Sequence, residues 1–138
     1  MMVKNVVLSE YSSNPPVVAG RVKILGTGPL YQLTRVQAIA ANENQLKLWT
    51  QKCIHDVNRL FDSDLAQVAE LVACLKESDY IDSEWCENGR LALVACDAYR
   101  IRRTFVAQAT GKRMPIEYFL KFAIGKTGNL VLMVSCHV

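Results

Sequence analysis

The chain has 138 residues, of which 51% are apolar and 21% carry a charge. This composition is typical of one folded globular domain and excludes a disordered chain. No apolar run approaches the roughly 18 residues that a membrane-spanning helix needs, and the N-terminus lacks the segments of a secretory signal. We therefore expect a cytoplasmic protein with no membrane contact.

Cysteine and histidine usage argues against a metal site. The chain has five cysteines and two histidines. The cysteines are odd in number, widely spaced and form no C-x-x-C pair, so a zinc site is not indicated. We expect reduced thiols, no metal ion and no other cofactor.

Charge is divided unevenly along the sequence. Residues 90–138 contain eight Lys/Arg and two acids, a formal net charge of +6, whereas residues 1–89 have a net charge of −3. Concentrated positive charge attracts phosphates and polyanions. The alternative is a solvated strand face that binds no nucleic acid.

The first section of the chain has β-like character. Two runs that favour strands, residues 3–10 and 17–25, are separated by a Ser-Ser-Asn-Pro-Pro stretch that interrupts regular structure. Gly26-Thr27-Gly28-Pro29 closes the section and is not a phosphate loop, because no G-K-[ST] follows it.

Apolar residues then recur at helical spacing. Three helices are predicted, over residues 34–42, 51–60 and 64–75. Thr34 and Gln37 have the spacing of a capping box at the start of the first helix. A short strand is expected at residues 46–49.

After Ser78 the apolar period changes to two, the spacing of β-strands. The predicted strands cover residues 79–86, 91–104, 116–124 and 129–138. The first is expected at the edge of the sheet, with a turn at residues 87–89, and residues 111–115 are expected to form a loop. The fold class is α+β, with the helices on one face of an antiparallel sheet.

Alternation along these strands predicts which side chains share a face. The outward face is expected to carry Arg100, Arg102, Lys121, Ser135 and His137. Arginine binds phosphate bidentately and lysine adds a point charge. Histidine titrates near neutral pH, so it can exchange a proton with an RNA 2′-hydroxyl or a leaving 5′-oxygen.

A group of acids lies just before these residues. Its members are Glu77, Asp79, Asp82, Glu84 and Glu87. Their close spacing and the lack of a Gly-containing ligand loop exclude a calcium site. We expect a solvated acidic edge.

Four short motifs stand in one order in the C-terminal half. They are Glu77-Ser78-Asp79-Tyr80, Asp97-Ala98-Tyr99-Arg100, Tyr118-Phe119-Leu120-Lys121 and Val134-Ser135-Cys136-His137. Together they resemble the "ESDF", "DVYR", "YLK" and "VSFK" motifs of the MqsR-like (motility quorum-sensing regulator) toxin family, a branch of the RelE-like superfamily. The resemblance covers residues 30–138 as a RelE/MqsR-like domain, and residues 1–29 are expected to be an N-terminal extension.

The resemblance implies a RelE-like fold, metal-independent cleavage of mRNA, and neutralisation by a cognate antitoxin protein. The family's active residues are a Lys in the turn, a Gln before the "DVYR" strand, the Tyr of "YLK" and a Lys in the last strand. The corresponding positions here are Asp82, Cys96, Phe119 and His137, with Tyr118 one residue before Phe119.

Two functions are therefore expected. The first is a toxin-type endoribonuclease, in which His137 is the general acid or base, Tyr118 a second proton donor, and Arg100 and Lys121 stabilise charge on the phosphate. RNA contacts are expected from Arg100, Arg102, Arg103 and Lys121. The alternative is a catalytically inactive RelE-like module that binds a protein partner or RNA on the same face.

Overall fold

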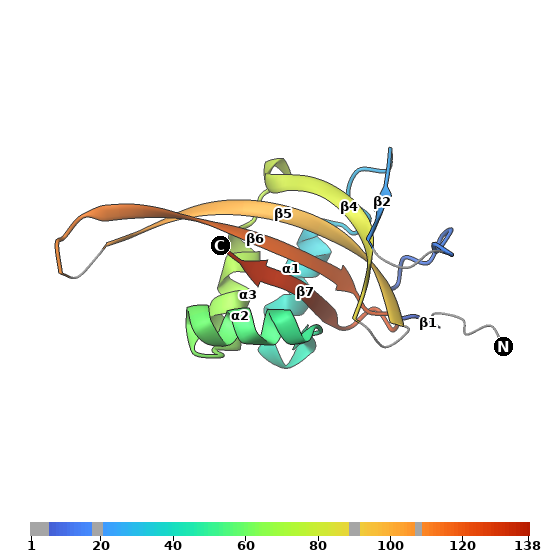
Figure 1. Ribbon diagram of the computed structural model, residues 1–138, viewed down its shortest axis with the longest axis horizontal. Coiled ribbons are helices and arrows are strands. Elements are labelled where there is room, and N and C mark those ends of the chain that lie inside the picture. The colour runs from blue at the N-terminus through green and yellow to red at the C-terminus, as the bar shows by residue number, and fades with distance from the viewer. Residues whose placement is uncertain (1–5, 18–20, 89–91, 107–108) are drawn as a thin grey trace.

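The computed structural model describes residues 6–17, 21–88, 92–106 and 109–138. This part of the chain is an α+β fold with three α-helices and a seven-stranded, mostly antiparallel sheet (Figure 1). The helices are α1 (Leu33–Ala40), α2 (Gln51–Phe61) and α3 (Leu65–Cys74). The strands are β1 (Val6–Val7), β2 (Val22–Ile24), β3 (Leu46–Leu48), β4 (Tyr80–Glu87), β5 (Ala92–Val106), β6 (Arg113–Ile124) and β7 (Val131–His137).

The strand order is β2-β4-β5-β6-β7-β3, and β1 pairs with β5 off this path. β1 and β3 run parallel to their partners, and the other neighbours are antiparallel. β4 was expected at the edge of the sheet, but this is wrong because β2 pairs with its outer side. The expected turn at 87–89 and the start of the strand at residue 91 extend into residues 89–91, which lie outside the described part.

The start of α1 differs from the expected capping box. Gln32 is the N-cap residue and its side chain makes no capping hydrogen bond. The Gln37 amide instead donates to the carbonyl oxygens of Val72 at 3.1 Å and Leu75 at 3.0 Å, at the end of α3. The side chain that resembled a cap therefore joins two helices.

The other two helices begin at side-chain caps. Thr50 Oγ1 accepts from Cys53 N at the start of α2, and Asp64 accepts from Ala66 N at the start of α3. Such caps satisfy amides that have no partner inside the helix. α2 ends at Phe61, and the C-cap residue Asp62 has φ 51°.

Apolar side chains from all three helices join a core with strands β4 to β7. Residues at helical spacing supply it, such as Val36 and Ala40 of α1, Cys53 and Val57 of α2, and Val68 and Val72 of α3. None of the helices in the described residues is long and apolar enough to cross a membrane.

β5 and β6 extend beyond their neighbours. The pairing of β4 with β5 ends at Tyr99, and the pairing of β7 with β6 ends at Phe119. From Arg100 onward the two strands pair with each other, up to Val106 and Arg113, and project from the body as a two-stranded ribbon (Figure 1). The loop expected at residues 111–115 is therefore too long, because β6 begins at Arg113.

Residues 6–10, in the N-terminal segment, form backbone hydrogen bonds with the same sheet. Leu8 N donates to Leu93 O and Glu10 N to Ile124 O, each at 2.8 Å. The Ser9 side chain is 1% exposed and its Oγ accepts from Ala95 N at 2.9 Å. These contacts place residues 6–10 between β5 and the turn that joins β6 to β7.

Candidate functional site

Three strands bring an arginine, an aromatic ring and a histidine into one row. Arg100 on β5 is directly opposite Phe119 on β6, and Phe119 is opposite His137 on β7. The rings of Phe119 and His137 stack, with centroids 5.6 Å apart and an interplanar angle of 25°. The backbone register therefore gathers Arg100, Phe119 and His137 on one face of the sheet.

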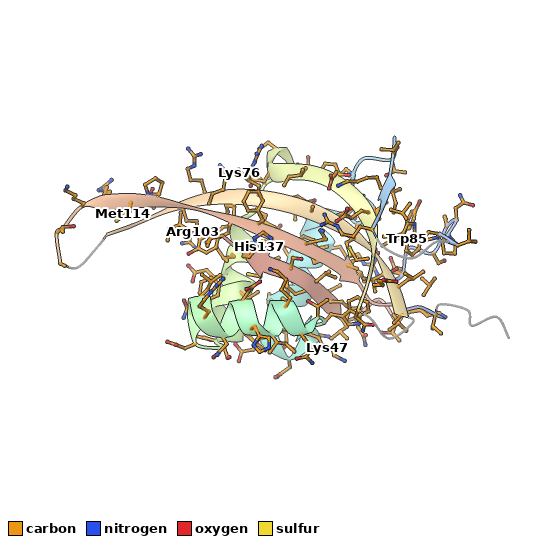
Figure 2. The ribbon with its side chains drawn as sticks, viewed as in Figure 1. Lys47, Lys76, Trp85, Arg103, Met114 and His137 are labelled. Carbon is orange, nitrogen blue, oxygen red and sulfur yellow. The ribbon has the colours of Figure 1, made fainter. Side chains whose placement is uncertain are left out.

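A pocket of about 210 Å³ adjoins this row. Its lining includes the Phe119 ring and seven polar or charged residues: Arg21, Lys23, Asp82, Glu84, Lys121, Ser135 and His137. Figure 2 shows His137 at the middle of the molecule, near the base of the ribbon. A second cavity of about 550 Å³ shares Arg21, Lys121, Ser135 and His137 with the first.

The pocket has a buried carboxylate at its floor. Glu84 is 1% exposed and forms an ion pair with Lys121. Arg21 lies 3.0 Å and Lys23 3.2 Å from the two oxygens of the same carboxylate. Burial by itself would raise the pKa of Glu84, but the pairing with Lys121, Arg21 and Lys23 outweighs it and lowers that pKa to about 2.

Glu84 is an exception to the expected solvated acidic edge because it is buried, whereas Glu77 and Glu87 are exposed as expected. Lys23 stands opposite Glu84 in the register of β2 with β4, and Lys23 also binds Asp82 at 2.5 Å. Sequence reasoning missed Glu84 as a site residue. No local signal identified it, because the face of Glu84 follows from its register opposite the buried Cys96 of β5.

Lys121 was expected to be an exposed cation on the outward face. It does face the pocket, but its side chain is only 14% exposed and is paired with Glu84. The expectation that it is exposed is wrong because β4 places a carboxylate within its reach. An ammonium group has three N–H donors, so donors remain for a pocket ligand.

Tyr118 and Arg103 lie on the opposite face from His137. The Tyr118 ring packs against Phe61 of α2, with centroids 5.8 Å apart. Arg103 contacts Glu70 of α3 at 3.4 Å (Figure 2 labels Arg103). Tyr118 was expected to share a site with His137, and this is wrong because adjacent strand residues point to opposite faces. The same alternation separates Arg103 from Arg100 and Arg102.

The two remaining arginines lie where alternation predicts. Arg102 is on the same face as Arg100 and contacts Glu117 at 3.5 Å. Arg100 is exposed and forms no ion pair among the described residues. Arg100 is therefore the cation best placed to meet a phosphate beside His137.

The positions singled out by the family resemblance fall near one another. Asp82, Phe119 and His137 all line the smaller pocket. Cys96 is fully buried and directly opposite Glu84, and burial raises the pKa of its thiol well above the ordinary value. Cys96 is therefore a buried, neutral thiol beside Glu84 and is not among the residues that line the pocket.

Asp97, which belongs to a matching motif, has a structural role. Its buried carboxylate accepts hydrogen bonds from Ser83 Oγ at 2.6 Å and from the backbone amides of Leu30 and Tyr31. Burial raises the pKa of Asp97, and these hydrogen bonds oppose the increase. The residue ties the segment before α1 to β4 and β5.

The described residues contain no group of three His, Cys, Asp or Glu side chains arranged to hold a metal ion. No protein-family profile, curated protein sequence or solved structure matches this chain.

Proposed function

We propose that this chain is a RelE-like endoribonuclease of the toxin type that cleaves mRNA next to His137 without a metal ion. The observation that carries the proposal is the row of Arg100, Phe119 and His137 beside a pocket lined by Lys121 and Arg21. An α+β chain whose three helices precede the antiparallel strands β4 to β7 is consistent with a RelE-like fold whose helices cover one sheet face.

The exposed side of this row suits a nucleotide. Unpaired RNA bases stack on aromatic rings, and Phe119 is partly exposed beside His137. Arg100 and Lys121 can contact the phosphate of the same nucleotide through N–H donors. Phe119 would therefore hold the base while the cations hold the backbone.

The reaction needs a proton acceptor and charge stabilisation. The 2′-oxygen forms a bond to the adjacent phosphorus and the bond from phosphorus to the 5′-oxygen breaks. His137 takes the proton of the 2′-hydroxyl, and water protonates the leaving 5′-oxygen. Arg100 and Lys121 stabilise the negative charge that develops on the phosphate oxygens. The products are a 2′,3′-cyclic phosphate and a 5′-hydroxyl.

The carboxylate of Asp56 lies close enough to His137 for the two side chains to interact electrostatically. Asp56 of α2 has a lowered pKa, mainly because it binds Lys52 at 2.8 Å, and the positive form of His137 adds to this effect.

The test is RNA cleavage by purified protein in EDTA. We expect His137→Ala to slow cleavage by about two to four orders of magnitude, the usual effect of losing an acid–base group. His55 is exposed on α2, away from both pockets, so His55→Ala is the matched control. Equal cleavage by wild type and His137→Ala would contradict the proposed role of His137.

The second candidate is an inactive module that binds RNA or a protein partner. The ion pairs of Lys121 with Glu84 and of Arg102 with Glu117 favour it, because they neutralise two of the predicted phosphate-binding cations. RNA binding without cleavage in the same assay would select this function. Growth arrest on expression, relieved by a small protein encoded beside the gene, would favour the toxin and its cognate antitoxin.

A further inference from the structure

The ribbon formed by β5 and β6 concentrates positive charge beyond the pocket. Residues 100–117 contain five Lys/Arg and one acid, a formal net charge of +4. Lys112 and Arg113 lie at the far end of the ribbon, are exposed, and form no ion pair among the described residues. A free, exposed cation can pair with a phosphate without first breaking an internal contact.

The register connects the end of the ribbon with the site. Arg100 and Arg102 pair with Phe119 and Glu117 of β6, and alternation places Arg113 on the same face of β6 as these two residues. Arg113 therefore belongs to the face that begins at Phe119 and His137. Ribbons of two strands twist strongly, and a flexible single strand of RNA can follow a twisted face.

The other face of the ribbon differs in character. It carries Ile101, Met114 and Ile116, with Met114 labelled far from the body of the molecule in Figure 2. The ribbon is thus amphipathic, with its apolar residues turned away from the face of Arg100. Arg103 also lies on this other face but is paired with Glu70, so the unpaired positive charge is on the face of Arg100.

We infer that the basic face of the ribbon and the turn at its far end form a second RNA-binding surface, in which Arg113 of β6 and Lys112 of the turn hold the phosphates of nucleotides remote from the pocket. This inference rests on the proposed RNA substrate. It adds the prediction that tight binding requires an RNA long enough to reach from the pocket to the end of the ribbon. Six residue steps separate Arg100 from Val106, about 20 Å of strand. That distance matches roughly six stacked nucleotides at about 3.4 Å each.

The experiment compares RNAs of two lengths. Single-stranded RNAs of 4 and 12 nucleotides, 2′-O-methylated throughout so that no attacking hydroxyl remains, are titrated with protein at several salt concentrations. Wild type should bind the longer RNA more tightly. In the variant Lys112→Gln/Arg113→Gln that advantage should disappear, and the slope of log affinity against log salt for the longer RNA should fall by about 1.4, since each single-strand phosphate contact contributes about 0.7.

The control removes two charges elsewhere. Lys47 and Lys126 are exposed, and Lys126 lies in the turn at the other end of β6, so Lys47→Gln/Lys126→Gln should keep the wild-type slope. If the ribbon variant binds the longer RNA with an unchanged slope, the ribbon inference is wrong while the proposed function stands. If wild type binds neither RNA at low salt, the RNA substrate itself is wrong and both fail.

Discussion

Glu84 shows how one buried side chain organises the pocket. It lies on β4 opposite Cys96, whereas Lys121 lies on β6 opposite Ala98 of β5. Two strand spacings of about 4.8 Å separate β4 from β6, and a lysine can reach across because both intervening side chains are small. The small residues of β5 therefore allow the ion pair that forms the floor of the pocket.

We expect Glu84→Gln to lower the free energy of unfolding by about 3 kcal/mol at pH 7. A carboxyl pKa that falls from about 4.5 to about 2 on folding corresponds to this amount, and removing one member of a buried ion pair has a similar cost. Because the pKa is lowered in the folded state, the stabilisation is complete above about pH 4.5 and is lost as the pH falls toward 2.

Urea unfolding at several pH values measures this effect. The difference between wild type and Glu84→Gln should shrink steadily as the pH falls below about 4.5. Glu87 is exposed at the end of β4, so Glu87→Gln should unfold like wild type at every pH. If Glu84→Gln is as stable as wild type at pH 7, the ion pairs of Glu84 make no net contribution to the free energy of unfolding.

The start of α2 fastens the helix to the strand that carries His137. Thr50 Oγ1 accepts from Cys53 N at 3.1 Å and donates to Val134 O of β7 at 2.8 Å. A single hydroxyl thus caps the helix and sets its position against β7. This contact holds the helix end that lines the larger cavity beside His137.

Thr50→Ala should lower the free energy of unfolding by about 1–2 kcal/mol, because both hydrogen bonds of the hydroxyl are lost. Thr50→Ser keeps the hydroxyl and should retain most of the stability. Chemical denaturation of the three proteins measures the difference. Equal losses in the Ala and Ser variants would point to the methyl group instead of the cap.

Charges from distant parts of the sequence meet in the folded chain. The basic C-terminal third supplies Lys121 and Arg103, whose partners Glu84 and Glu70 come from the acidic first part. The first part in turn supplies Arg21, which lines both pockets. The uneven division of charge along the sequence is therefore much weaker in space, although the ribbon keeps the exposed cations Arg100, Lys112 and Arg113.

We expect removal of residues 1–11 to lower the free energy of unfolding by more than about 3 kcal/mol. The deletion removes the Ser9 hydroxyl from the buried Ala95 amide and the Tyr11 ring from Trp85, 6.2 Å away. An unpaired buried amide alone costs about 1–3 kcal/mol. A chain that begins at residue 6 keeps these contacts and is the control. Equal melting temperatures of the two chains would contradict a structural role for the N-terminal segment.

Local patterns predicted most elements of this fold. The helices at residues 51–60 and 64–75 and the strands at 116–124 and 129–138 correspond to α2, α3, β6 and β7 with small shifts. Alternation also placed Arg100 and His137 on one face. These features depend on the spacing of side chains along a regular backbone, which neighbouring residues encode.

The partners of the charged residues required the tertiary structure. Alternation identified Lys121 as facing outward, but its pairing with Glu84 depends on the order and register of β4, β5 and β6. The attachment of β2 beside β4 then adds Arg21 and Lys23 to the same carboxylate. Strand order results from the burial of apolar surface over the entire sheet, and no local window of sequence contains that information.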